Sequence, residues 1–468
     1  MKIKTIPSSW ISREGRRLDC GPYMSGALET KIRLEELSAR KDSLQSLTKG
    51  HNGGIYNGPK FSRTWVDSPE YGVPFVGSSD MLRADLSDLP LLRKKDAESN
   101  KLSYLRLAPG MTLISCSGTI GRMVYARPDM DGIWSSQHIM KVVPDPAKIP
   151  SGYLYAYLSS KFGVPQVVSG TYGSIIQSIE PHHIADLPVP RLGDAVEQRA
   201  HALVEEAARL RTRATHLLAG AIQKVQMHAD LTPLTEITSP MPFSITLVSS
   251  TLVKERFDAF FHSSYHKQVV EQLQRAGVPL KKVRDIADSI VEPTRFKRIP
   301  VDDPAHGVPF FGTSALMWNE PLPSYYLPRR QKGIDEYIVT ERAVLVPRSG
   351  QLSGIIGTAV LPYGQLVNGA VTEDAIRINC NDERDSGFIY LFLTSSFGIR
   401  QLKSRAYGTS IPHLDVKQIG EVLLPDLGED VQRQIGQMGL DVADMRDKAI
   451  HHENEAIRLV EQAIEEAA

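Results

Sequence analysis

Cysteine is scarce in this chain of 468 residues, and the three that occur, Cys20, Cys116 and Cys380, lie far apart. They form neither a CxxC metal pair nor a disulfide framework, so we expect a reducing compartment. Long apolar runs are missing too: no stretch approaches the ~18 residues of a spanning helix, and the N-terminus has no apolar signal core. These absences predict a cytoplasmic protein with no membrane partner.

Motifs for catalysis are also missing. The sequence has no GxxxxGK[ST] phosphate loop, no Asn-Pro-Pro-Tyr or Asp-Pro-Pro-Tyr tetrad of an adenine methyltransferase, no GxSxG elbow and no HExxH pair. Pro144-Asp145 followed by Lys148 lacks the second carboxylate of a nuclease core, and the histidines lack ligand partners at metal spacing. We therefore predict no catalytic residue, no metal site and no cofactor in this chain.

Net charge is missing as well, because 54 Lys and Arg balance 54 Asp and Glu. Acid is concentrated in residues 428–468, which hold four Lys and Arg against ten Asp and Glu, a net charge of −6. Elsewhere the cluster Arg295-Phe296-Lys297-Arg298 places three basic residues within four positions, and we do not expect its neighbours to cancel that charge. This distribution excludes a strongly basic nucleic-acid binder but leaves room for a modest electrostatic footprint.

What the chain does contain is a long internal repeat. The block Gly72-Val73-Pro74-Phe75 returns as Gly307-Val308-Pro309-Phe310, an offset of 235 residues, and Tyr172-Gly173 returns as Tyr407-Gly408 at the same offset. A period this long makes two similar lobes rather than a solenoid, whose repeats span only tens of residues. Two similar lobes suggest a ligand that itself has two halves.

Each copy ends in a long helix with a heptad pattern. Mostly small or apolar residues recur at alternating spacings of four and three in both helices, and each residue is offset by 235 from its counterpart. The first helix has Val196, Ala200, Leu203, Ala207, Leu210, Ala214, Leu217 and Ala221. The second helix has Val431, Ile435, Met438, Val442, Met445, Ala449, His452 and Ala456. The pattern predicts that the two helices pair, antiparallel if the lobes are related by a two-fold axis. Alternatively, each helix packs alone on its own lobe. The first helix should end near Gly220 or Val225, because prolines follow. Thirty helical residues span roughly 45 Å, about the rise of 13 base pairs.

The lobes themselves should be mixed α/β. The predicted strands are Met111–Ser115, Met123–Tyr125, Ile139–Val143, Ala343–Val346, Ile355–Val360 and Ala375–Ile378, and the matching helices are Ser151–Leu158 and Gly387–Leu393. The charged stretch Lys31–Leu47 has no obvious equivalent in the second copy and predicts a local helix or insertion. The expected domains are residues 1–194 and 230–427 as lobes, with residues 195–229 and 428–468 as helices.

Polar, glycine-rich turns recur in both copies. Ser115-Cys116-Ser117-Gly118-Thr119-Ile120-Gly121-Arg122 is answered by Arg348-Ser349-Gly350-Gln351-Leu352-Ser353-Gly354, and Gly170-Thr171-Tyr172-Gly173-Ser174 by Ala406-Tyr407-Gly408-Thr409-Ser410. Hydroxyls beside glycine suit phosphate oxygens, and Arg and Gln suit base edges. The alternative is that the fold itself requires these turns, with Gly supplying positive φ.

With these features in the same order twice, the chain resembles the specificity subunit of type I restriction–modification enzymes over essentially its whole length. The resemblance rests on the Gly-Val-Pro-Phe blocks, Ser117-Gly118-Thr119-Ile120-Gly121, and the endings from Tyr172 to Gln198 and from Tyr407 to Gln432. It implies two target-recognition domains held by an antiparallel coiled-coil spacer, each reading half of a split DNA site. It also implies double-stranded DNA, DNA methyltransferase subunits and a restriction helicase–nuclease as partners, with S-adenosylmethionine bound by the methyltransferase.

Candidate DNA contacts follow from both lines of reasoning. Hydroxyls and lysines are expected to position phosphates, whereas Arg, Gln and His are candidate base readers. In lobe one they are Lys60, Arg63, Ser117, Thr119, Arg122, Gln137, Tyr172, Ser174 and Gln177. In lobe two they are Arg295, Lys297, Arg298, Arg348, Gln351, Ser353, Thr372, Tyr407, Thr409 and His413.

Two other classes of function stay open at this point. The chain could be an enzyme with an unrecognised nuclease or methyltransferase site, which an assay of the chain alone with divalent metal or S-adenosylmethionine would reveal. It could also be a scaffold of a phage-defence complex that uses the same fold without restriction, which would show no preference among DNA sequences.

Overall fold

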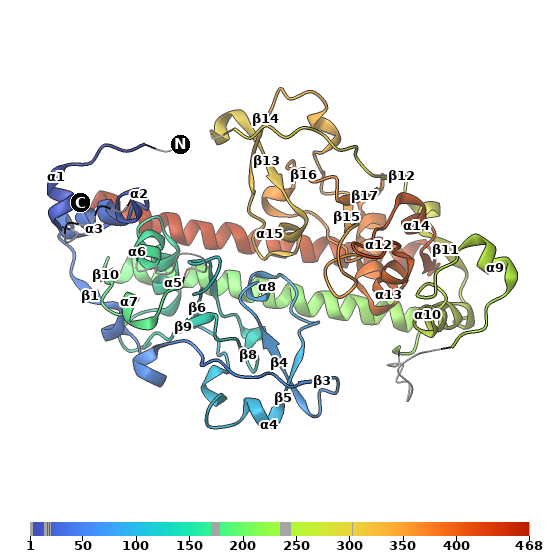
Figure 1. The fold of residues 1–468 in the computed structure, drawn as a ribbon, viewed down its shortest axis with the longest axis horizontal. Helices are drawn as coiled ribbons and strands as arrows, with labels where there is room; N and C mark the ends of the chain where they lie inside the picture. Colours follow the sequence, from blue (N-terminus) through green and yellow to red (C-terminus); the bar gives the residue numbers. More distant parts are fainter. Residues whose placement is uncertain are drawn as a thin grey trace. The chain divides into compact units, whose positions relative to one another are not determined.

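The chain folds into two compact units in a computed structural model that describes residues 3–13, 16, 18, 20–169, 178–234, 245–301 and 303–467. Unit 1 consists of Met1–Thr212 with Lys448–Ala468, and unit 2 of Arg213–Asp447. The two long helices, α8 (Asp194–His228) and α15 (Glu429–Glu466), are each divided between the units (Figure 1).

Unit 1 is mixed α/β, as predicted, with short strands in small sheets. Their strand orders are β2-β9-β6-β7, β3-β5-β4-β8 and β1-β10. The strands are β1 (Lys41–Ser43), β2 (Ile55–Tyr56), β3 (Trp65–Val66), β4 (Gly72–Val76), β5 (Leu91–Arg93), β6 (Thr112–Ser115), β7 (Met123–Tyr125), β8 (Trp134–Ser135), β9 (Ile139–Val142) and β10 (Pro188–Pro190). The shorter helices are α1 (Ser8–Arg13), α2 (Gly21–Met24), α3 (Ala27–Glu36), α4 (Lys94–Ala97), α5 (Ser151–Ser159), α6 (Gly163–Ser169) and α7 (Pro181–Ile184).

Unit 2 has the same kind of architecture. Its sheets have the strand orders β12-β17-β15, β14-β13-β16 and β11-β18. The strands are β11 (Leu280–Lys282), β12 (Ser289–Val291), β13 (Gly307–Phe311), β14 (Tyr325–Pro328), β15 (Ala343–Pro347), β16 (Ala370–Val371), β17 (Ala375–Asn379) and β18 (Leu423–Pro425). The shorter helices are α9 (Ser250–Glu255), α10 (Ser264–Arg275), α11 (Val283–Ile286), α12 (Glu383–Thr394), α13 (Ser396–Arg405) and α14 (Val416–Gly420).

The repeated Gly-Val-Pro-Phe blocks form equivalent strands in the two units. β4 runs antiparallel to β5 and parallel to β8, and β13 likewise runs antiparallel to β14 and parallel to β16. Gly72 and Gly307 begin these strands where a Cβ atom would lie 2.6 Å from Leu91 and 2.5 Å from Tyr326. The glycines are therefore kept because the neighbouring strand leaves no room for a side chain.

Most of the predicted elements are present, but Ile355–Val360 is not a strand. The chain turns there, and Val360 makes only an isolated bridge to Leu345. Gly357 adopts a φ of 73°, in the left-handed region that an extended strand cannot use. The β-branched residues of this stretch suggested a strand, and the glycine turn prevents it.

The stretch Lys31–Leu47 does have a counterpart in the second copy, so that expectation was wrong. It contains the end of helix α3 and strand β1, which pairs with β10. Unit 2 repeats this pattern with α10 and β11, which pairs with β18. The two segments differ in sequence, because only the pattern of buried residues has to be kept when a helix packs beside a short sheet.

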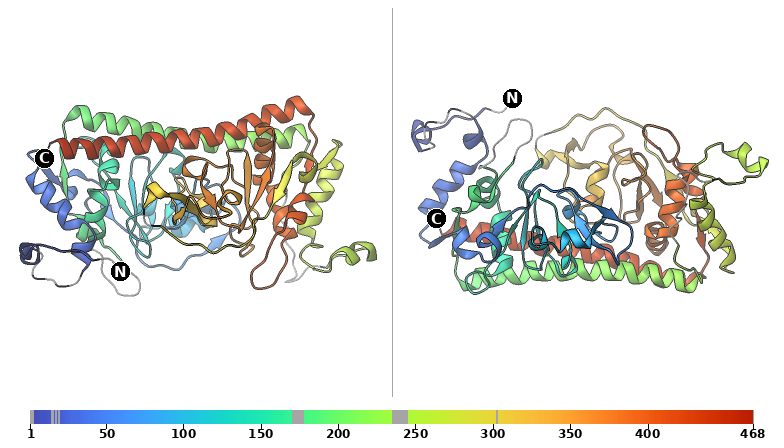
Figure 2. Two further views of the ribbon diagram at one scale, coloured as in Figure 1. Left: turned by 90° about the horizontal axis from the view of Figure 1, so that it is seen from above. Right: turned by 60° about the horizontal axis from the view of Figure 1, so that its bottom comes forward.

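The two long helices pack against each other in both units, which confirms their predicted pairing. In unit 1, Ala200 and Leu203 near the start of α8 share one hydrophobic cluster with Ala456 and Val460 near the end of α15. In unit 2, residues 214–225 of α8 share a cluster with residues 435–442 of α15. The ribbons of the two long helices run side by side there (Figure 2). The start of each helix thus meets the end of the other, which is the antiparallel order of a coiled-coil pair.

The buried stripe of α15 is wider than the predicted seam. Ile435, Val442, Ala449 and Ala456 are buried as expected. Arg446 and Glu453 are also buried, with 7% and 5% of their surface exposed, next to the predicted seam positions 445 and 452. A two-helix seam takes only a narrow stripe, but this helix also packs on the lobes, so it buries a broader face. None of the helices in the described ranges combines the length and the apolar character needed to cross a membrane.

Candidate nucleic-acid interface

In both units an arginine lies at the same place against two phenylalanine rings, which we call the aromatic shelf. The rings are Phe61 and Phe75 in unit 1 and Phe296 and Phe310 in unit 2. The guanidinium of Arg63 lies 5.2 Å from the ring centroid of Phe75 and 5.8 Å from that of Phe61. Arg298, offset by 235 from Arg63, lies 4.8 Å from the centroid of Phe310 and 5.9 Å from that of Phe296. A guanidinium on aromatic faces keeps its charge while its orientation is restrained. The repeat thus preserves a positioned cation in each lobe.

The partner of this arginine differs between the units. Arg63 donates a hydrogen bond to the Gln137 side-chain oxygen at 2.8 Å, and the Gln137 amide contacts His138 Nε2 at 3.0 Å. Burial, reinforced by the charges of Arg63 and Lys60, lowers the pKa of His138, which favours its neutral form. Unit 1 therefore surrounds its arginine with neutral polar groups.

In unit 2 the same position is held by a carboxylate. Arg298 forms an ion pair with Glu373 and donates to the Thr372 hydroxyl at 3.4 Å, and Arg295 lies 3.9 Å from Glu373. Burial opposes the charged form of Arg298, but its bond to Glu373 outweighs this and raises the Arg298 pKa. Thr372 is only 5% exposed, so its hydroxyl supports Arg298 within the fold. Lys297 is exposed beside them.

A tight turn after β6 presents the predicted hydroxyl residues of unit 1. The Ser115 hydroxyl donates to the Thr119 carbonyl at 2.6 Å and accepts from the Arg122 backbone N–H at 2.9 Å. Gly118 and Gly121 both have φ near 80°, which closes the turn. Thr119 is exposed at its tip, and Ser117 is partly buried. Ser115 was not among the predicted site residues, although it holds the turn together.

The corresponding turn in unit 2 is joined to a hairpin. Gly350 donates through its backbone to the Pro412 carbonyl at 3.2 Å, and the Gln351 side chain donates to the Ser410 carbonyl at 3.0 Å. Tyr407 and His413 exchange backbone hydrogen bonds of 2.9 and 2.7 Å across the hairpin. One polar loop cluster thus brings together six predicted residues: Arg348, Gln351, Ser353, Tyr407, Thr409 and His413.

Unit 1 shows the beginning of the same arrangement. Ser117 bridges to Ser178 as Ser349 bridges to His413. Cys116 and Arg348 occupy equivalent places, because each accepts a backbone hydrogen bond from the strand beyond the hairpin, from Ile179 and from Leu414. The predicted contacts Tyr172, Ser174 and Gln177 lie outside the described residues.

Charge pairing distinguishes the two loop clusters. Arg348 forms ion pairs with Glu292 and, at 3.7 Å, with Asp374. The position equivalent to Glu292 is Asn57, which donates to Glu180 at 3.1 Å, and Cys116 takes the place of the arginine. The offset of 235 would have paired Asn57 with Glu292 from sequence alone. These acids lower the net positive charge of the unit 2 surface.

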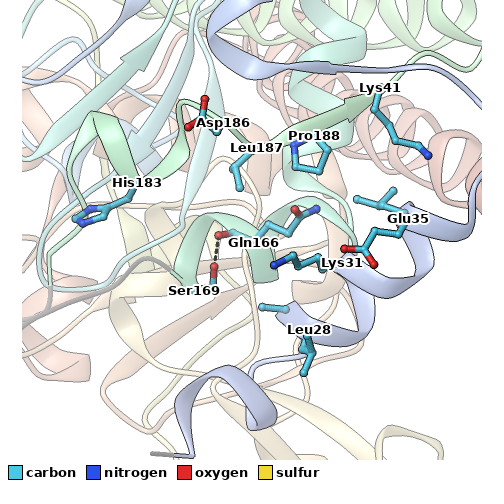
Figure 3. A pocket seen from close by; sticks show the side chains of 12 residues that line it. Leu28, Lys31, Glu35, Lys41, Gln166, Ser169, His183, Asp186, Leu187 and Pro188 are labelled. Carbon is cyan, nitrogen blue, oxygen red and sulfur yellow. Dashed lines mark hydrogen bonds between the residues drawn. The ribbon is translucent and has the colours of Figure 1, made fainter. Parts of the chain in front are cut away.

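A separate pocket of about 440 Å³ lies in unit 1 between α3, α6 and α7 (Figure 3). Its lining mixes Lys31 and Lys41 with Glu35 and Asp186, and Gln166 accepts a hydrogen bond from Ser169 at its wall. The predicted contact residues that the structure describes do not line it. Within the described ranges, no group of three or more His, Cys, Asp or Glu is arranged to hold a metal ion.

Comparison with known proteins gives structural neighbours alone. No family model matches the chain, and no curated protein matches its sequence. An S subunit of a type I restriction–modification system from M. genitalium aligns at 13% identity over 92% of this chain and 96% of that chain, with a TM-score of 0.32. A structure from work on complex assembly and conformational transition of the type I R-M system aligns at 13% identity over 92% and 98%, with a TM-score of 0.27. The HsdS subunit from Thermoanaerobacter tengcongensis aligns at 12% identity over 91% and 96%, with a TM-score of 0.27.

Proposed function

We propose that this chain is the DNA-specificity subunit of a type I restriction–modification system. The recognition domains are residues 1–194 and 230–427, and the spacer helices are residues 195–229 and 428–468. One observation carries the proposal: an arginine on an aromatic shelf, Arg63 and Arg298, recurs beside a polar loop in each of two repeated lobes. A duplicated cationic surface joined by paired helices suits a split double-stranded DNA target.

Each lobe would contact one half-site in the major groove. A restrained guanidinium can donate two parallel hydrogen bonds to guanine, and exposed hydroxyls such as Thr119 and Thr409 suit phosphate oxygens. The two lobes differ in the groups around the arginine, with Gln137 in one and Glu373 in the other. We therefore propose that the two half-sites differ in sequence and that the full site is asymmetric.

The chain would act without catalysis of its own and direct partner subunits. Methyltransferase subunits, which bind S-adenosylmethionine, would dock on the helix pair, and a restriction helicase–nuclease would join the same complex. The support is indirect: α15 contains ten Asp and Glu against four Lys and Arg, and the sequence lacks catalytic motifs.

Selection of duplexes from a random double-stranded library tests the proposal directly. The purified full-length chain should enrich two short sequence blocks separated by a fixed number of unspecified base pairs. Arg63→Ala should blur one block and Arg298→Ala the other. Enrichment of one contiguous block, or no enrichment at all, would contradict a bipartite specificity subunit and favour the scaffold alternative.

The enzyme alternative needs its own assay. The purified chain is incubated with duplex DNA and S-adenosylmethionine, or with duplex DNA and Mg²⁺, in the absence of partner subunits. We expect neither methyl transfer nor strand cleavage. A modified or cut product that survives further purification of the chain would show that it has a catalytic site of its own.

A further inference from the structure

The apolar seam of α8 is nearly the same in every heptad. Alanine occupies one seam position at 200, 207, 214 and 221, and leucine occupies the other at 203, 210 and 217. If α15 slid along α8 by seven residues, about 10 Å, alanine would again face the position that alanine left. Hydrophobic packing along α8 therefore specifies the axial register of the two helices only weakly.

A buried charged layer lies beside this seam in unit 1. Arg211 of α8 forms an ion pair with Glu453 of α15, and their side chains are only 10% and 7% exposed. The Tyr155 hydroxyl of α5 donates a hydrogen bond to the same carboxylate. The layer lies within the cluster that contains Ala208 and Ala456. Charges at this depth are tolerated only when they are paired.

A slide of one heptad would break this layer in either direction. Glu453 would be replaced opposite Arg211 by Arg446 on one side or by Val460 on the other. The first places two cations together, and the second leaves a buried cation beside an aliphatic group. Glu453 itself would meet Val204 or Leu218 instead of Arg211.

A slide of one heptad would also break an exposed ion pair between the two helices. Arg199 contacts Glu455 at 3.1 Å, and a slide of seven residues would substitute Lys448 or Gln462 for that acid. The layer is also asymmetric within the repeat. Arg446, the counterpart of Arg211, contacts the Tyr390 hydroxyl at 3.3 Å, whereas the counterpart of Glu453 is Leu218. The duplicated pattern therefore keeps the arginine and the tyrosine in both copies but the acid only in α15.

We propose that the layer of Arg211, Glu453 and Tyr155 fixes the axial register of α8 and α15. Tyr155 belongs to α5 of the first lobe, so the layer also holds that lobe at one position along α15. Polar residues in coiled coils specify register at some cost in stability. Resting on the proposed function, the inference extends to DNA: the register determines how many unread base pairs separate the two half-sites.

The decisive variant replaces both charges at once, Arg211→Leu with Glu453→Leu. Because an apolar pair removes the desolvation cost, the melting temperature should equal or exceed that of the natural chain. A variant that folds well and still loses register separates specificity from stability. The matched control removes the exposed ion pair instead, Arg199→Leu with Glu455→Leu, and should keep a single register because the buried layer stays intact.

Register is measured by the distance between two spin labels in the full chain. Arg209→Cys on α8 and Gln462→Cys on α15 are exposed positions in unit 1, and Cys20→Ser removes the exposed native thiol. The natural chain and the control without the exposed pair should each give one distance. The variant with leucine at 211 and 453 should add a second, because a slide of one heptad displaces a label by about 10 Å.

DNA spacing is measured on the same proteins by selection from a random duplex library. The variant with leucine at 211 and 453 should enrich the two blocks at more than one separation, and the control without the exposed pair at the natural separation only. One unchanged label distance, or a second distance with unchanged DNA spacing, overturns the inference. If the natural chain enriches no split motif, the proposed function fails, and the label distances alone then decide whether the layer sets the register.

Discussion

Arg63 and Gln137 are joined by a hydrogen bond of 2.8 Å, which links the segment before β3 to the segment after β8. The equivalent arginine of unit 2, Arg298, is instead paired with the carboxylate of Glu373. The two lobes thus hold the same cation in the same place with partners of different charge. A neutral amide leaves the positive charge of Arg63 available to an anion, whereas a carboxylate competes with DNA for Arg298.

We therefore expect unequal effects from removing the two arginines. Arg63→Ala should weaken binding of a selected duplex by about 1–3 kcal/mol and make the salt dependence less steep. Arg298→Ala should change the salt dependence less, because Arg298 is already paired with Glu373 and therefore neutralises less phosphate charge. Fluorescence anisotropy at two or more salt concentrations gives both quantities. The control is Arg275→Ala, whose side chain is 78% exposed on α10. Equal changes in salt slope for Arg63→Ala and Arg298→Ala would show that Glu373 does not shield its arginine.

Gln351 tests base reading in the second lobe. Its amide nitrogen donates to the Ser410 carbonyl at 3.0 Å, which orients the side chain and leaves its oxygen as an acceptor. Gln351→Ala should relax specificity in one half-site only, at a cost of about 1–3 kcal/mol. The control is Gln437→Ala on α15, because Gln437 also donates a 3.0 Å bond, to Asp441. The readout is the enriched motif; if neither block changes in the Gln351 variant, that residue reads no base.

The repeat made the larger features of this fold predictable. Paired copies exposed which glycines the fold needs, as at Gly72 and Gly307, where the neighbouring strand excludes a side chain. They also located the two long helices, because a heptad pattern is a local property of the sequence. The helix pairing could be predicted because both helices carry the same heptad spacing.

Contacts between distant segments could not be predicted in the same way. Thr372 looked like an exposed contact residue, yet the fold buries it beside Arg298, 74 residues earlier in the chain. The acids that pair with Arg348 are Glu292, directly after β12, and Asp374, directly before β17. No local sequence pattern identifies either of them as a partner of Arg348. Arg446 and Glu453 were missed because a heptad pattern identifies apolar positions, whereas a helix that also packs on a lobe buries charged neighbours.

A close approach of backbones predicts where the long helix α15 tolerates no side chain. A Cβ atom on Gly436 would lie 2.0 Å from the Arg384 carbonyl oxygen, and one on Gly387 would lie 2.0 Å from the Gly436 carbonyl oxygen. Gly436→Ala should therefore lower the free energy of unfolding by at least the about 1–3 kcal/mol that is typical of an overpacked core. Gly220→Ala on α8 is the matched control, since nothing lies within 4 Å of its Cβ position.

The free energy of unfolding of the control variant should change in the opposite direction. Alanine is favoured over glycine inside a helix by about 1 kcal/mol, so Gly220→Ala should raise the unfolding free energy. Thermal or urea unfolding of both variants measures the difference. A Gly436 variant as stable as Gly220→Ala would show that α12 and α15 do not approach each other as closely as described.

Lys141 is a fully buried cation in the sheet of unit 1. Its ammonium donates to the Ile139 carbonyl at 3.0 Å and lies 5.8 Å from the centroid of the Tyr56 ring. Burial lowers its pKa to about 7. Arg377 occupies the equivalent strand position in unit 2 and, unlike Lys141, donates to several backbone carbonyl groups.

The lowered pKa predicts a pH dependence of stability. Between about pH 7 and the ordinary lysine pKa near 10.4, the unfolded chain binds a proton at Lys141 that the folded chain does not. Unfolding free energy should therefore rise with pH across this window, and below it the full penalty of burying the charge applies. Lys141→Met should be more stable than the natural chain at pH 7, and this advantage should shrink as pH rises toward 10. Melting temperatures at several pH values give the difference, and Lys95→Met, at an exposed position, should show no such trend. If the advantage of Lys141→Met stays constant across the window, the ammonium keeps an ordinary pKa in the folded chain.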